Sequence, residues 1–481
     1  MRRRAVALAG ALLAGGCTLG PDYVRPPVDA PAAFRFAPKE QADTANLAWW
    51  TRFGDPVLDA LIDEALANNR NVQVAVANVD QAAGVFTQVR SPLFPQLGYG
   101  ASAARERASE AGRSPLVNDL VANPQNAYQA ALSVTWELDL WGRIRRQSEA
   151  ARANLLATDE ARRGVILSVV GSVAGNYLQL RGLDAQLEVA KKTLGAYAES
   201  VKLFTLQFRY GQVSQMNVAQ AQSQYETAAA QIPQIESQIA QVENGLSILL
   251  GRNPGPIERG KTIDQLVVPL IPADLPSALL QRRPDILQAE QNLVAANANV
   301  GATRALYYPS VSITGLLGSV STAFSSLFTG PASAGLIAAG VSGPIFTFGG
   351  IEGQVSSAEA QNRQALLLYQ QTILNAFRET NDALTGSQKK IEEVALQGKR
   401  VDALREFARL SKLRFDKGVA AYLDVLVAEN ELFAAELAGV RLLADRYTQL
   451  VSVYQAMGGG WVDIAASATP TPQSTLTAEA P

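Results

Sequence analysis

Two matching stretches, one in each half of the chain, decide the fold. FRYGQVSQMNVAQAQ (208–222) matches FDKGVAAYLDVLVAE (415–429) at an offset of 207 residues. The same offset pairs LDLWGRI (138–144) with IFTFGGI (345–351). Chance similarity would not keep one offset over so long a stretch. The chain is therefore an internal duplication, and each copy is far longer than the repeat unit of a solenoid.

Each half also contains two long helices joined by a tight turn. No proline interrupts residues 125–232 or 345–469. Apolar residues recur every seven positions, as in coiled-coil seams, in a first row of Leu180, Leu187, Leu194, Val201 and Phe208 and a companion row of Leu183, Ala190, Tyr197 and Phe204. A helix over residues 142–208 would be on the order of 100 Å long. We expect Gly211 and Gly418 at the left-handed position that ends a helix, and Pro233 to kink or break the following helix.

Apolar and polar side chains alternate between Tyr128 and Leu138, which is the period of a β-strand. Residues 97–103 and 310–314 alternate in the same way, whereas the expected fourth strand at 336–348 alternates poorly. Four strands are too few to close a barrel, and hydrocarbon does not tolerate open strand edges. The strands should therefore close with strands of other chains; dimers would supply eight strands and trimers twelve.

These elements predict a mixed α and β membrane protein with four β-strands per chain, continued by a helical barrel of long coiled-coil hairpins. The predicted segments are a signal peptide (1–16), an extended arm (17–50), a first repeat (51–255), a linker (256–277), a second repeat (278–460) and a disordered tail (461–481). Within the two repeats, a helix is followed by strands at 91–140 and 306–348 and then by long hairpins at 142–251 and 349–458.

The composition disfavours an enzyme and a nucleic-acid binder. The chain has 481 residues, with 42 basic and 44 acidic side chains, no histidine and one cysteine. Without histidine it lacks the commonest general base and metal ligand. One cysteine cannot form an intrachain disulfide or a zinc cluster, and near-zero net charge does not give the basic field that nucleic-acid binding requires.

The first seventeen residues have the pattern of a lipoprotein signal. Arg2, Arg3 and Arg4 precede a nine-residue apolar run and the small residues before Cys17, which is a secretory signal too short to span a bilayer. The only cysteine lies where a lipoprotein signal peptidase would cut, so we expect a diacylglycerol and an N-acyl lipid on Cys17. The alternative is an ordinary signal peptide whose cysteine is incidental.

Several spaced motifs resemble the outer membrane factor family, the TolC- and OprM-like exit ducts of efflux pumps and secretion systems, and especially its lipoprotein branch. They are GCTLGPDYVRPPV (16–28), WWTRFGDPVLDALIDEALANN (49–69), WELDLWGRIRR (136–146), LLGRNPG (249–255), RRPDILQAEQNLVAANANVGATRALYYPSVSITGLLG (282–318), YLDVLVAENELFAAEL (422–437) and MGGGW (457–461). The resemblance implies a homotrimer with a twelve-stranded barrel in the outer membrane and a helical tunnel through the periplasm. It also implies a periplasmic adaptor and an RND-type inner-membrane pump as partners, with no resident cofactor.

A duct needs a constriction rather than catalytic residues, and the hairpin turns at 208–218 and 415–425 are the candidates. In a trimer, Asp424 would form an acidic ring that favours cations; it aligns with the first of two aspartates that form such a ring in TolC-like relatives, while Val427 occupies the second position. The alternative role for Asp424 is to stabilise a helix N-terminus. Asp416, Lys417, Arg209 and Tyr210 are candidate contacts at the gate, or simply solvated side chains.

The leading functional prediction is a passive outer-membrane duct that exports drugs or other small molecules for a tripartite pump. An exit duct for type I protein secretion is an alternative of the same class. A periplasmic coiled-coil scaffold without a pore is the alternative of a different class, and four alternating strands argue against it.

Overall fold

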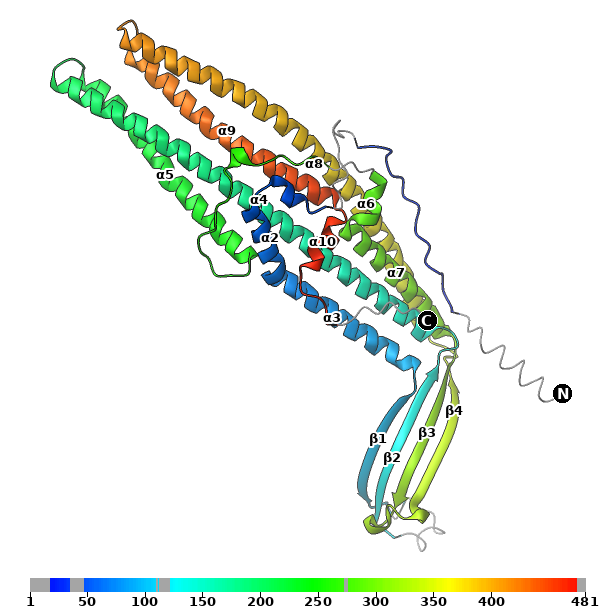
Figure 1. Ribbon diagram of the computed structural model, residues 1–481. Helices are drawn as coiled ribbons and strands as arrows, with labels where there is room; N and C mark the ends of the chain where they lie inside the picture. The colour runs from blue at the N-terminus through cyan, green and yellow to red at the C-terminus, as the bar shows by residue number, and fades with distance from the viewer. Residues whose placement is uncertain (1–17, 35–46, 110, 112–121, 272–275, 474–481) are drawn as a thin grey trace. The chain divides into compact units, whose positions relative to one another are not determined.

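The computed structural model describes residues 18–34, 47–109, 111, 122–271 and 276–473 (Figure 1). The predicted signal peptide and Cys17 lie outside these residues. The chain divides into two compact units. The first unit contains Gln81–Ala157 and Glu290–Leu368 together with the start of the chain, and the second contains Pro27–Asp80, Thr158–Ala289 and Tyr369–Pro481.

The first unit contains one antiparallel sheet in the order β1-β2-β3-β4 (Figure 1). Its strands are β1 (Gln96–Glu106), β2 (Gln125–Leu138), β3 (Ser310–Ser321) and β4 (Ser333–Ser342). The second predicted strand region, 306–348, was too wide at both ends. Ala305–Tyr307 is a 3-10 helix, Pro309 precedes β3, and β4 ends at Ser342 before Pro344, because proline cannot donate to a strand ladder.

The register of the sheet separates an apolar face from a more polar one. Tyr99 pairs with Leu132, and Leu132 pairs with Leu317, so these three side chains form one row across β1, β2 and β3. All three are exposed in the single chain, Tyr99 to 90%. On the opposite face Gln96 pairs with Thr135, which pairs with Thr314. No helix in the described part of the chain has the length and apolar character needed to cross a membrane.

Each repeat contributes one helical hairpin. The hairpins are formed by α4 (Arg143–Arg209) with α5 (Gln215–Leu249) and by α8 (Gly350–Asp416) with α9 (Tyr422–Met457). Gly211 and Gly418 in the two turns have φ angles of 70° and 72°, the left-handed conformation that glycine adopts without strain. Of the two outcomes predicted for Pro233, a kink or a break, the break does not occur, because α5 is helical from Gln215 to Leu249 with Pro233 inside it.

The companion row of the predicted seam is the more deeply buried one. It comprises Leu183, Ala190, Tyr197 and Phe204, all of them buried. In the first row only Leu180 is fully buried, and Phe208, nearest the turn, is 44% exposed. A seven-residue repeat drifts around a straight helix of 3.6 residues per turn, so the two rows cannot both face the core along the whole of α4.

The single helix expected before the strands of each repeat is two helices in the structure. The first repeat has α2 (Pro56–Asn68) and α3 (Arg70–Arg90), and the second has α6 (Pro276–Arg282) and α7 (Pro284–Arg304). The breaks fall at Asn69 and Arg283, which are 214 residues apart. That is the offset of the matching segments 65–75 and 279–289, so the break is part of the duplicated unit.

A hydrogen bond at each break is also duplicated, although the residue types differ. The Asn69 side-chain amide donates to the Leu249 carbonyl at 2.7 Å, and the Arg283 guanidinium donates to the Ala456 carbonyl at 2.7 Å. Leu249 and Ala456 are 207 residues apart and lie at the C-terminal ends of α5 and α9. Each bond supplies a donor to a helix end whose last carbonyls have no partner within the helix.

The prediction of a disordered tail from residue 461 was wrong for its first part. Trp461–Ser467 form the helix α10, and Trp461 is fully buried. Its ring packs edge-on against Trp49 and Trp50, with ring centroids 5.8 and 5.9 Å apart. Trp49 and Trp50 belong to the 3-10 helix Trp49–Phe53, so the predicted arm boundary at residue 50 divides an ordered element.

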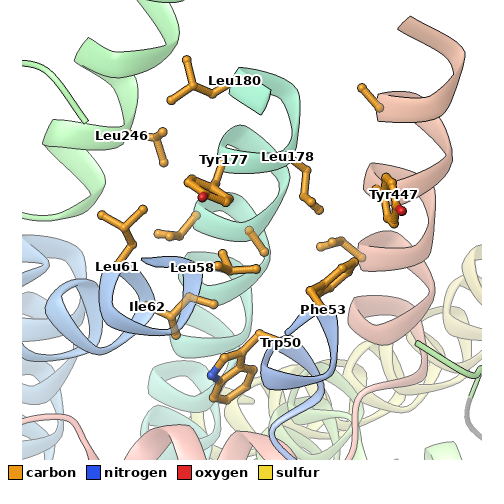
Figure 2. Close-up of a cluster of buried hydrophobic side chains, with 14 of the residues drawn as sticks. Trp50, Phe53, Leu58, Leu61, Ile62, Tyr177, Leu178, Leu180, Leu246 and Tyr447 are labelled. Carbon is orange, nitrogen blue, oxygen red and sulfur yellow. The ribbon is translucent and has the colours of Figure 1, made fainter. Parts of the chain in front are cut away.

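These aromatic residues belong to the main core of the second unit. Figure 2 shows Leu58, Leu61 and Ile62 of α2 facing Tyr177 and Leu178 of α4. Phe53 of the 3-10 helix and Tyr447 of α9 lie beside them. The 3-10 helix Trp49–Phe53, α2 and α10 therefore pack on α4 and α9 through large apolar side chains, which is the dominant favourable contribution to folding.

We predict that Trp461→Ala lowers the free energy of unfolding by about 3–5 kcal/mol, because it removes a buried tryptophan and leaves a cavity. Urea unfolding of the detergent-solubilised protein, followed by the helical circular dichroism signal, measures this loss. Ile464→Ala in the same helix is the matched control, since Ile464 is 43% exposed. Equal small losses in both variants would contradict a core role for α10.

Candidate functional site

The predicted gate residues all lie at the hairpin turns of the second unit and are exposed. Arg209 and Asp416 are the last residues of α4 and α8, and Tyr210 and Lys417 follow them. In the described part of the chain, no hydrogen bond or ion pair joins the Arg209, Tyr210, Asp416 or Lys417 side chain to another residue. The single chain therefore brings them to the turns without pairing them.

Asp424 is exposed in the first turn of α9. Its backbone amide donates to the Ala421 carbonyl at 3.1 Å, and the N-cap residue Ala421 offers no side-chain cap. A carboxylate at this position interacts favourably with the helix dipole, so the helix-stabilising role has the required geometry. The same exposed position leaves the carboxylate free to face other copies of the chain.

Just behind the turns, an aromatic cluster joins the two hairpins. The ring of Phe204 on α4 lies 4.0 Å from that of Tyr422 on α9 and 6.1 Å from that of Phe415 on α8, measured between centroids. Phe415 and Tyr422 are 5.3 Å apart. The sequence pattern placed Phe204 only in the coiled-coil seam of the first hairpin. Its position close to a glycine turn was the signal that it could also contact the second hairpin, where Phe415 and Tyr422 lie.

A partly buried carboxyl group lies in the second turn of α9, close to this cluster. Burial raises the pKa of Glu429 above its ordinary value of 4.5, against the opposing effect of Lys412. Burial also raises the pKa of Tyr197, and the negative charge of Glu429 adds to that increase. The Tyr197 hydroxyl donates to the Asn430 side-chain oxygen at 3.4 Å. Glu429 was absent from the sequence predictions, because a single glutamate in a helix gives no sign of its burial.

In the first unit, the arm that follows Cys17 is held against α4 and α7. The buried Arg146 guanidinium pairs with Asp22 at 2.6 Å and donates to the Leu19 carbonyl at 3.2 Å. Gly20 and Gly301 touch so closely that a Cβ on Gly20 would lie 2.4 Å from the Gly301 Cα. Thr18, one residue from Cys17, is thus in a fixed part of the chain.

The corner between strand and helix in this unit is held by tryptophan. Trp141 donates from its indole nitrogen to the Pro309 carbonyl at 2.7 Å, and its ring lies 4.8 Å from that of Tyr308. Trp136 donates to the Leu93 carbonyl at 3.0 Å. These contacts are packing contacts at the corner between strand and helix. Among the described residues, no cluster of acidic or cysteine side chains is arranged to hold a metal ion.

A model of outer membrane efflux proteins matches residues 61–252 and 275–459, the two repeats. The chain belongs to the outer membrane efflux protein family. It is 35% identical over 468 residues to TtgC of Pseudomonas putida, a probable efflux pump outer membrane protein, with 94% of each chain covered. It is 33% identical over 457 residues to the cation efflux system protein CusC of Escherichia coli, covering 94% of this chain and 97% of CusC.

A solved structure of the same kind has the same fold. The MtrE outer membrane channel of Neisseria gonorrhoeae, in its open state, matches with a TM-score of 0.84 at 29% identity, over 95% of this chain and all of MtrE. The resemblance inferred from the sequence motifs and the expected mixed α and β fold are confirmed. The efflux protein is an outer-membrane channel component.

We predict that Glu429→Gln stabilises the efflux protein at pH 7.5 and that the gain shrinks as the pH falls. Because the folded-state pKa of Glu429 is raised, the folded protein binds this proton more tightly than the unfolded chain, so ionisation costs stability above that pKa. Thermal unfolding of both proteins between pH 4.5 and 7.5 measures the gain. Glu431→Gln, at an exposed position of α9, should show no such pH dependence, and parallel behaviour of the two variants would contradict the prediction.

Proposed function

We propose that this efflux protein works as a homotrimeric exit duct, anchored by lipid on Cys17, that passively conducts small molecules across the outer membrane. In this proposal a periplasmic adaptor connects it to an RND-type inner-membrane pump, and the pump supplies the energy. The duct itself performs no chemistry.

The two-faced sheet with unpaired edges is the observation that carries the proposal. Within the described residues β1 pairs only with β2, and β4 pairs only with β3. The exposed apolar row of Tyr99, Leu132 and Leu317 suits hydrocarbon, but free strand edges do not. Three copies of the four-stranded sheet would supply twelve strands and remove every edge.

The fixed arm supports lipid anchoring. Leu19 donates its backbone amide to the Trp141 carbonyl at 3.2 Å, beside the end of β2. A lipid on Cys17 would be attached two residues before Leu19, so the acyl chains would start within about two residues' length of this corner. That attachment would put the lipid next to the strands that are proposed to enter the same membrane.

The cargo class is proposed from the family. A TtgC protein is named for toluene efflux, and CusC is named for cation efflux. Because this chain is similarly identical to both, its proposed cargo is the broader class that contains both, small molecules. An exit duct for type I secretion would use the same sheet and hairpins. A scaffold without a pore would have no use for a sheet with one exposed apolar face.

Reconstitution of the full-length protein in planar lipid bilayers tests the proposal. Unitary currents, together with a trimer mass in native mass spectrometry, are the expected result; a monomer without currents would contradict it.

We predict that Asp424→Ala reduces the cation selectivity of these currents, because a trimer would lose three carboxylates from one ring. Asp416→Ala serves as the comparison, and unchanged selectivity in Asp424→Ala would contradict the gate role of Asp424.

Lipid attachment is tested separately in cells fed an alkyne-tagged fatty acid. We predict that Cys17→Ser abolishes labelling of the protein, because serine offers no thiol for the diacylglycerol. The wild-type protein is the positive control. Labelling that persists in the variant would show that the lipid is attached elsewhere and would contradict anchoring at Cys17.

A further inference from the structure

The segment that follows β4 in the first unit exposes three large apolar side chains. They are Ile345, Phe346 and Phe348, which we call the apolar corner; Phe346 is 72% exposed and Phe348 is 88% exposed. The rings of Phe346 and Phe348 meet edge-on, with centroids 4.3 Å apart. Phe348 also has a φ angle of 50°, a left-handed conformation that is uncommon for a bulky residue and costs energy.

The equivalent corner of the first repeat finds its partners within the chain. At the offset of 207 residues, the counterpart of Phe346 is Asp139, whose side chain caps the start of α4 by accepting from backbone amides. The counterpart of Phe348 is Trp141, whose ring lies 4.8 Å from that of Tyr308. The second repeat therefore has an apolar, exposed corner where the first repeat has a capped and partly covered one.

The offsets of the duplication also reproduce the register of the strands. Gln96 of β1 pairs with Thr135 of β2. The counterpart of Gln96, 214 residues further along the chain, is Ser310. The counterpart of Thr135, 207 residues further along, is Ser342. Ser310 and Ser342 are paired in the β3–β4 ladder, so the two offsets convert a contact of one repeat into the matching contact of the other.

Applied to the corner, the same offsets give Phe348 a partner. Trp141 corresponds to Phe348, and Tyr308 corresponds to Phe94, which is itself 58% exposed. Phe94 precedes β1 and Phe348 follows β4, so they lie at the same end of the sheet but at its two opposite edges. One chain thus carries both halves of this contact and cannot bring them together.

The strands next to the corner fit the same arrangement. Val134 of β2 pairs with Gly315 of β3. Their counterparts are Val341 of β4 and Ala101 of β1. Both counterparts lie on the face of the sheet that carries Tyr99, since side chains alternate along a strand and paired residues share a face. Pairing β4 with β1 of another copy in this register therefore continues the apolar face of the sheet.

We infer that the apolar corner binds a second copy of this chain, with Phe348 against Phe94 and Val341 opposite Ala101. The inference rests on the proposed homotrimer and adds the residues that join its protomers. Burying aromatic rings that are exposed in the single chain favours this association. The contact also supplies the packing that holds Phe348 in its left-handed conformation.

Cysteine pairs test the register. Ala101→Cys with Val341→Cys places two thiols directly opposite each other across the inferred contact. Ala101→Cys with Ile337→Cys is the matched control, because Ile337 is exposed on the same face of β4, four residues from Val341. Within one chain β1 and β4 are separated by β2 and β3, about 14 Å in all. A disulfide cannot span that distance, so any disulfide joins two copies.

Both full-length double variants and the wild type, whose one cysteine is Cys17, are oxidised in detergent with copper phenanthroline. Covalent dimers and trimers on denaturing gels are expected only for Ala101→Cys with Val341→Cys. Trimers in native mass spectrometry that form no disulfide in this pair, or form it equally in the control pair, would overturn the inference and leave the homotrimer intact. A monomeric wild type would refute the proposed homotrimer, and the inference with it.

Alanine variants test the aromatic contact itself. Phe94→Ala and Phe348→Ala should each lower the temperature at which the trimer dissociates in detergent. The double variant should lower it by less than the two shifts added together, because both substitutions remove one contact. Phe328→Ala, at a 79% exposed position between β3 and β4, is the control and should cause no shift. Additive shifts, or no shift in either single variant, would overturn the contact between Phe348 and Phe94.

Discussion

Backbone groups at the edges of one small sheet constrain the quaternary structure of this protein. β1 and β4 each pair on one side only within the described chain, and hydrocarbon offers no substitute for the missing hydrogen bonds. The apolar row through Tyr99, Leu132 and Leu317 nevertheless requires an apolar environment. Both demands are met together only when other copies of the chain complete the sheet, and this is the physical basis of the proposed trimer.

The long helices make a different use of their two faces. On α4 the side that carries Tyr177 and Arg181 is fixed to α2 and the linker by hydrogen bonds, and the side that carries Gln179 and Gln186 has these amides beside the buried Leu183. The first side is fixed by polar contacts with other segments, and the second mixes amides with buried apolar side chains. A helix of 67 residues can carry two such different faces because its opposite faces need not share a residue.

Duplication preserved geometry more strictly than residue type. Asn69 and Arg283 occupy equivalent breaks between helices, and both donate to equivalent carbonyls, those of Leu249 and Ala456. An amide and a guanidinium serve equally well there because the helix end needs only a donor. Comparison of residue types alone would not have paired these two positions in function, whereas their equivalent places in the matching segments 65–75 and 279–289 do.

The sequence by itself determined the duplication, the four strands, the two hairpins and the turns at Gly211 and Gly418, because period, proline spacing and glycine conformation are local properties of the chain. It could not determine that Trp461 is buried by Trp49 and Trp50 or that Glu429 is partly buried, nor that α5 continues through Pro233. The burial of Trp461 and of Glu429 depends on contacts between segments hundreds of residues apart, and only tertiary packing decides which face of a helix is covered and which remains open.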